Sequence, residues 1–91
     1  MYTLSAKLTF YIPYADSLKD KRQVSRSLID KARHKFNASI AEVATQDVHQ
    51  TLTIGIAVIS SENAHAKQSL EAIVRYMESH TDAELSEVES Y

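Results

Sequence analysis

The sequence has no cysteine and no tryptophan, and it has one glycine and one proline among its 91 residues. The absence of cysteine excludes disulfides, thiolate zinc sites and cysteine nucleophiles, and it suits a reducing cytoplasm. The single glycine, Gly55, excludes glycine-rich phosphate loops and dinucleotide-binding fingerprints, because these need several glycines. No apolar run approaches the roughly 18 residues of a membrane span. Met1 leads directly into an alternating pattern instead of a secretion signal. We therefore expect a cytoplasmic protein without a membrane partner.

The composition that remains is typical of a folded globule. Hydrophobic residues make up 44% of the chain and charged residues 24%, and the formal net charge is only −2. A chain of 10.2 kDa has room for one core. The sequence therefore predicts a single domain over residues 1–91.

The first half of the chain changes its hydrophobic period at the proline. Residues 2–12 alternate strictly between apolar and polar side chains, which indicates a half-buried strand that ends before Pro13. Ser17 is a candidate N-cap with Asp20 in the acidic position of a capping box. From Leu18 to about Phe36 the period lengthens to that of an amphipathic helix. Its expected buried stripe consists of Val24, Leu28, Ile29, Ala32 and Phe36.

The second half of the chain is predicted to form two strands, a second helix and a last strand. Residues 38–46 and 50–60 are predicted strands, joined by a short turn at residues 47–49. In the first of them either face could be buried, and we favour burial of Ala41 and Val43. Ser60 or Ser61 is the expected cap of the second helix. The expected buried stripe of that helix consists of Ala66, Leu70, Ile73, Val74 and Met77.

Residues 83–89 form the last predicted strand. Leu85 and Val88 break its alternation, which indicates a β-bulge. The resulting βαββαβ order predicts an α+β, ferredoxin-like sandwich with both helices on one face of an antiparallel sheet. The first and third strands are the most apolar and belong at the centre, while glutamates protect the second and fourth at the edges. The expected strand order is 4-1-3-2.

The first predicted helix carries an unbalanced positive charge. Residues 17–36 contain seven basic and two acidic side chains, so the rest of the chain is acidic. At 100° per residue, four of the basic side chains fall on one face opposite the apolar stripe, namely Lys19, Arg22, Arg26 and Arg33. The second helix instead alternates its charges at Lys67, Glu71 and Arg75, as an ordinary solvated surface does. The basic face is therefore a candidate RNA or anion-binding site. The alternatives are a solvated helix face and a surface for an acidic protein partner.

The open face of the sheet is the second candidate surface. Thr53, Gly55 and Ala57 are small, which would allow a close approach of two sheets in a homodimer. On this hypothesis Gly55→Arg would shift a dimer toward monomer and leave the fold intact. Stacking of RNA bases on this face is disfavoured because Tyr11 is its only aromatic residue and lies near a strand end.

Neither the histidines nor the serines form a recognisable catalytic or metal-binding pattern. His34, His49, His65 and His80 lack ligand spacing, so we expect no metal, and no other cofactor is indicated. Ser60 and Ser61 precede His65, but helix capping explains these serines, and no oxyanion-hole loop accompanies them. We therefore expect neither an enzyme nor a small-molecule substrate.

Several separated motifs resemble the YlxP-like family, a small bacterial domain of unknown function. They are Ile12-Pro13, Ala15, Ser17-Leu18-Lys19 with Lys21-Arg22, Phe36-Asn37, Ala41-Glu42-Val43, Gln46-Asp47, Gly55-Ile56-Ala57-Val58 and Ser60-Ser61. The signature loop and helix start correspond to Pro13, Ser17, Leu18, Lys19, Lys21 and Arg22, and Tyr14 is bulkier than the small residue expected after the proline. The resemblance implies a ferredoxin-like fold without an established enzyme activity. Genes of family members often lie between those for a translation initiation factor and ribosome-binding factor A, so the resemblance also implies a role at the ribosome or with RNA.

Lys21 of this signature projects toward the core side of the first helical turn, so packing or charge pairing is expected of it as much as binding. Together these observations lead to one hypothesis and one alternative. The hypothesis is a non-enzymatic accessory factor in ribosome maturation or translation that contacts rRNA or a ribosomal subunit through the basic helix face. The alternative is a homodimeric interaction module that uses the open sheet face and has no nucleic-acid role.

Overall fold

A computed structural model describes all 91 residues, and its six elements have the types and order that the sequence periods predict. Their boundaries differ from the predicted ones by at most two residues. The elements are β1 (Tyr2–Tyr11), α1 (Leu18–Lys35), β2 (Ser39–Ala44), β3 (Thr51–Ser60), α2 (Asn63–Ser79) and β4 (Glu84–Ser90). Neither helix is both long and apolar enough to cross a membrane.

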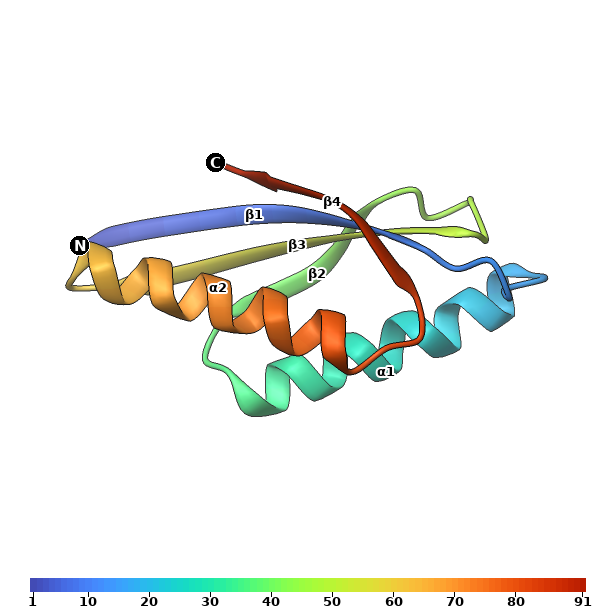
Figure 1. Cartoon of the computed structure of the whole chain (residues 1–91), viewed down its shortest axis with the longest axis horizontal. Coiled ribbons are helices and arrows are strands. Elements are labelled where there is room, and N and C mark those ends of the chain that lie inside the picture. The colour runs from blue at the N-terminus through green and yellow to red at the C-terminus, as the bar shows by residue number, and fades with distance from the viewer.

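The four strands form one antiparallel sheet in the order β2-β3-β1-β4, which confirms the predicted topology. Both helices lie on one face of this sheet, and the other face is open (Figure 1). The central strands β1 and β3 pair along their whole length, from Tyr2 opposite Ser60 to Tyr11 opposite Thr51. β4 covers only part of the far edge of β1, from Ala6 to Tyr11.

The core lies between the sheet and the two helices. Alternate side chains of β1 and β3 supply the sheet side, including Leu8, Phe10 and Ile54, each 0% exposed. Leu28, Ile29 and Ala32 of α1 are buried as predicted, while Val24 and Phe36 of the predicted stripe are half-buried. In α2 the buried stripe matches the prediction except that Val74 is half-buried.

The buried face of β2 is the opposite of the one that we favoured. Ile40 is 1% exposed and pairs with Ile56, whereas Ala41 is exposed and Val43 is 51% exposed. Burying Ile40 removes more apolar area from water than burying Ala41 does. Because side chains alternate along a strand, Glu42 points to the same face as Ile40, toward the helices. There the buried ammonium group of Lys21 pairs with it. This long-range pairing explains why the prediction was wrong.

The strand β4 contains the irregularity that its sequence predicts. Its pairing with β1 shifts between Thr9 and Phe10, because Thr9 lies opposite Glu87 and Phe10 lies opposite Leu85. The extra residue turns Leu85 toward the core although its parity differs from that of Val88. The β-bulge is therefore confirmed.

The start of α2 differs from the predicted cap. The N-cap residue is Glu62, and its side chain caps no backbone N–H group. Ser60 lies two residues earlier, and its Oγ accepts the Glu62 N–H at 3.1 Å. Ser60 thus orders the turn before the helix, while Ser61 is exposed, so neither serine is the helix cap.

Candidate nucleic-acid interface

The helix α1 begins where its cap residue predicts. Ser17 has extended backbone angles, and its Oγ accepts the Asp20 N–H at 3.1 Å. The Asp20 carboxylate accepts the N–H of Asp16 at 3.0 Å instead of that of Ser17, so the reciprocal bond of a capping box lies one residue earlier. The other signature residues serve this loop, because Pro13 accepts a hydrogen bond from the Gln50 side chain at 3.2 Å and Leu18 is half-buried.

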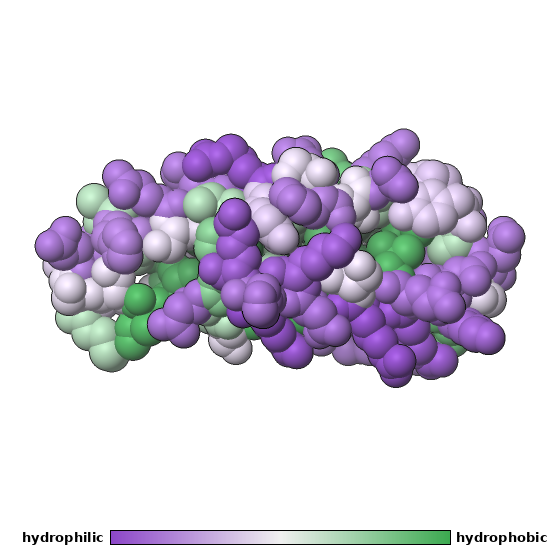
Figure 2. All heavy atoms as spheres, turned by 90° about the horizontal axis from the view of Figure 1, so that it is seen from below, coloured by the Kyte–Doolittle hydropathy of each residue, from purple (hydrophilic) through white to green (hydrophobic).

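The basic face of α1 is exposed as predicted. The side chains of this face are all exposed, and no carboxylate oxygen lies within 4.0 Å of the charged nitrogens of Lys19, Arg22, Arg26 and Arg33. The two ion pairs of the molecule involve other lysines, Lys7 and Lys21. Viewed from the helical side, hydrophilic side chains cover most of the surface and apolar areas are small (Figure 2). The helix therefore presents cations that no acidic group of this chain pairs with.

Arg33 differs from the other three cations of this face. Its Nε donates to the carbonyl oxygen of Ile40 at 2.9 Å, and its Nη2 donates to the same oxygen. This contact joins the last turn of α1 to β2. Two of the five N–H donors of Arg33 are thus used inside the molecule. The cations that are free for a ligand are chiefly Lys19, Arg22 and Arg26.

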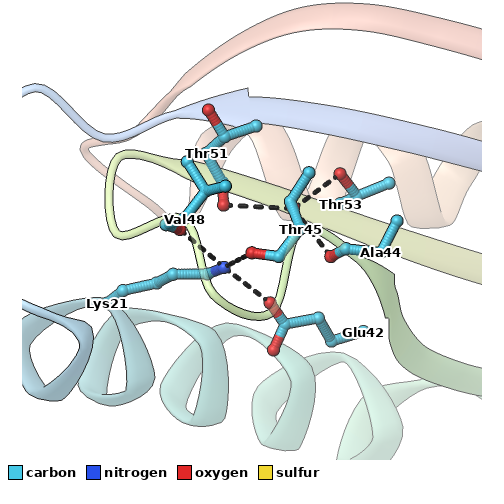
Figure 3. A network of polar contacts seen from close by, with 7 residues as sticks. All are labelled: Lys21, Glu42, Ala44, Thr45, Val48, Thr51 and Thr53. Carbon is cyan, nitrogen blue, oxygen red and sulfur yellow. Dashed lines mark hydrogen bonds and ion pairs between the residues drawn. The ribbon is translucent and has the colours of Figure 1, made fainter.

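Lys21 lies on the opposite side of α1 and is 1% exposed. Its Nζ lies 2.9 Å from Glu42 Oε2, donates to the Val48 carbonyl at 2.9 Å and donates to the Thr45 carbonyl (Figure 3). Two carbonyl acceptors and one carboxylate thus surround the ammonium group. Lys21 therefore ties the first turns of α1 to the β2–β3 connection, as its position on the core side indicated.

Thr45 closes this network from the β2 side. It has a positive φ of 59°, which is costly for a β-branched residue. Its Oγ1 compensates with contacts to Thr53 Oγ1 at 2.9 Å and to the Thr51 carbonyl at 3.2 Å. Sequence reasoning missed this strained corner, since it placed the turn at residues 47–49 and continued the strand through Thr45. The Thr45 carbonyl at this corner and the Val48 carbonyl after it both accept hydrogen bonds from Lys21.

The open sheet face offers less for a dimer than its small residues suggested. Thr53 is 4% exposed because Thr45 covers it. A Cβ added at Gly55 would lie 2.8 Å from Val43 Cγ1, so the space beside Gly55 is already filled. Gly55→Arg would therefore have to displace the Val43 side chain on the edge strand β2, in addition to blocking the open face. Gly55 and Ala57 still line an open hollow of about 370 Å³.

An ion pair of two partly exposed side chains borders this hollow. Lys7 and Glu89 face each other across β1 and β4, with Lys7 Nζ 3.5 Å from Glu89 Oε1. The Glu89 carboxylate, with a smaller contribution from Tyr91, raises the pKa of Lys7 above its ordinary value of 10.5. The Tyr91 hydroxyl donates to Glu89 at 3.1 Å, and this bond and then the Lys7 charge lower the pKa of Glu89. The group is a surface ion pair that connects two strands.

The histidines are dispersed, and no three side chains among histidine, aspartate and glutamate are grouped as a metal site would need. Ser60 Oγ does lie 3.0 Å from His65 Nδ1. The same oxygen accepts the Glu62 N–H, and no third residue orients the imidazole, so the pair is a turn contact. His80 ends α2 as its C-cap, where its ring approaches the Tyr76 carbonyl at 2.8 Å.

Comparison with known proteins gives a family and a fold. Residues 3–90 match the model of DUF503, a protein family of unknown function. The uncharacterized protein YlxP of Bacillus subtilis (strain 168) is 34% identical over 70 residues, which cover 77% of this chain and 76% of that protein. Among solved structures, the de novo designed ferredoxin-fold protein LFR1 1 matches with a TM-score of 0.60 and 19% identity. That match covers all of this chain and 84% of the designed one, so the fold is ferredoxin-like.

Proposed function

The chain belongs to the DUF503 family of proteins of unknown function, and we propose that it is a non-enzymatic accessory factor that contacts RNA through α1. The RNA would be free or part of a ribosomal particle in the cytoplasm. One observation carries the proposal: Lys19, Arg22 and Arg26 are exposed on one helix face without a carboxylate partner.

Two features of the structure support an anionic partner. Lys21 and Arg33 make polar contacts inside the molecule, whereas the side chains of Lys19, Arg22 and Arg26 make none. The charges of these three side chains are therefore not needed to hold the core together. A phosphate backbone supplies negative charges at regular spacing along a groove or strand, which suits several cations on one helix face. The acidic remainder of the chain limits this attraction to α1 and opposes non-specific binding over the whole surface.

Salt titration of RNA binding by the purified protein tests this proposal. Three or four phosphate contacts give a log–log salt slope of roughly −2 to −3. An increase from about 50 to about 200 mM salt then weakens binding on the order of 30-fold. Arg22→Gln/Arg26→Gln should make the slope shallower by roughly 1.5 and weaken binding to different sequences alike.

The matched control removes the same charge from α2. Lys67→Gln/Arg75→Gln changes two exposed cations that flank Glu71, so it should leave the slope unchanged. Equal slopes for the α1 and α2 variants would show that α1 is not the interface. In cell lysate at low salt, the protein should sediment with ribosomal particles during growth. Protein found only at the top of the gradient would contradict the ribosomal part of the proposal.

A homodimer through the open sheet face is the alternative. The hollow around Gly55 and Ala57 supports it, while the burial of Thr53 and the contact of Val43 with Gly55 weaken it. Light scattering at high protein concentration tests this alternative. A molar mass of the wild-type protein equal to that of a monomer would contradict it.

A further inference from the structure

A polar hollow of about 340 Å³ lies beside the basic face, between the middle of α1 and the connection from α2 to β4. Its polar and aromatic lining consists of Tyr14, Gln23, Ser27, His80, Thr81 and Asp82. Val24 and Leu28 add apolar surface from α1. The hollow thus combines flat rings, hydrogen-bonding groups and apolar carbon, the combination with which proteins hold a nucleobase.

The imidazole of His80 is held in place without a ligand. Its ring stacks on Tyr76 with 3.9 Å between centroids, and Tyr76 packs edge-on against Phe36. The carbonyl of Tyr76 can only accept a hydrogen bond, so Nδ1 of His80 donates to it at 2.8 Å. Lys35 adds a cation 5.2 Å from the Tyr76 ring. A ring that is already ordered loses little conformational entropy when a base stacks on it.

The hollow adjoins the free cations along the helix. Gln23 and Ser27 directly follow Arg22 and Arg26, so the two pairs occupy neighbouring strips of α1. Asp82 in the lining repels a phosphate, but its carboxylate can accept hydrogen bonds from the amino group of a base. The charges therefore favour the phosphates at the arginines and the base in the hollow.

We infer that the hollow binds an unpaired nucleobase of the RNA strand whose phosphates contact Arg22 and Arg26. This inference rests on the proposed function and deepens it, because it makes single-stranded RNA the preferred ligand. In a duplex the bases are stacked and paired, and none can enter a hollow on a protein surface without being unstacked.

The test uses a single-stranded RNA of about ten nucleotides that carries one 2-aminopurine, free or annealed to its complement. The wild-type protein should prefer the free strand and change its 2-aminopurine fluorescence by stacking. Tyr14→Ala and His80→Ala should each weaken binding roughly fivefold or more and remove the fluorescence change, with the salt slope retained. Ser27→Leu fills the hollow from an exposed helical position, so it should act in the same way without removing a ring.

Tyr11→Ala is the matched control, since Tyr11 is 42% exposed, similar to Tyr14 at 49%, but lies on the open sheet face. Equal affinity for free and annealed strands would overturn the inference. So would a fluorescence change that survives Tyr14→Ala and Ser27→Leu. In both cases the RNA role of α1 would stand, provided that its salt slope responds to Arg22→Gln/Arg26→Gln. Absence of RNA binding by the wild-type protein at low salt would instead overturn the proposed function itself.

Discussion

The ammonium group of Lys21 and the carboxylate of Glu42 lie 2.9 Å apart, with the Lys21 side chain 2% exposed and that of Glu42 22% exposed. The Oε2 atom of Glu42 is buried, and Lys21 is its single partner. Removing one member of such a pair leaves a charge without compensation in a poorly hydrated place. The pair therefore makes the attachment of α1 to β2 sensitive to single substitutions.

Lys21→Met should lower the free energy of unfolding by about 3 kcal/mol, as measured by urea denaturation. The substitution leaves Glu42 unpaired and also deprives the Thr45 and Val48 carbonyls of a donor. Arg22→Met is the control, because it changes the next residue of the same helix at an exposed position. It should alter stability by less than about 0.5 kcal/mol.

The double variant Lys21→Met/Glu42→Met should recover part of the lost stability, since it removes the unpaired carboxylate as well. If Lys21→Met were as stable as Arg22→Met, the buried ion pair would contribute nothing and this account of the network would be wrong.

Arg33→Gln should show that Arg33 serves mainly stability, whereas the other cations of the basic face serve RNA binding. It removes hydrogen bonds to the Ile40 carbonyl, so it should cost about 1 kcal/mol of stability. Arg26→Gln should cost almost nothing in the same denaturation experiment but should reduce the salt slope of RNA binding more. A stability loss in Arg26→Gln equal to that in Arg33→Gln would contradict the separate roles.

Gly55→Ala should destabilise the protein by about 1 kcal/mol, because the new Cβ would lie 2.8 Å from Val43 Cγ1. β2 is an edge strand, so it can yield by a small shift. Val43→Ala/Gly55→Ala should regain the loss, since it removes the contacting methyl groups. Chemical denaturation of the four proteins of this cycle measures the coupling, and additive effects would show that the contact is not the cause.

The Lys7–Glu89 pair predicts a pH-dependent contribution to the attachment of β4. Glu89 has a lowered pKa, so its contribution is present above its ordinary value of 4.5 and is lost as the pH falls through the folded pKa. Lys7 has a raised pKa, so its contribution is present below 10.5 and is lost as the pH rises through the folded pKa.

The difference in melting temperature between wild type and Lys7→Gln should therefore be flat between these two values and shrink on either side. Lys67→Gln removes an exposed α2 lysine that forms no ion pair, so it should show no such profile. High salt should reduce the Lys7→Gln difference at every pH, because both side chains are partly exposed.

The fold could be predicted because local sequence patterns indicate each element. Examples are the apolar period of two in β1 and the Ser17 cap before α1. The basic face of α1 was equally readable from helical geometry. What could not be predicted depends on partners far along the chain. The burial of Ile40 instead of Ala41 follows from the pairing of Glu42 with Lys21, and the link from Arg33 to Ile40 has no local signal. The hollow at Tyr14 and His80 likewise joins residues 66 positions apart, and no local pattern predicted it.

The pairing of β1 also has a consequence for how the chain folds. β2 and β3 are joined by a short connection and can pair locally, whereas β1 finds its neighbours only in residues 51–60 and 84–90. Closing such large loops costs conformational entropy before any contact rewards it. We therefore expect the hairpin to form early and the synthesis of β4 to precede completion of the sheet. Of the four strands of this sheet, the one that is synthesised first is then the last to acquire both of its neighbours.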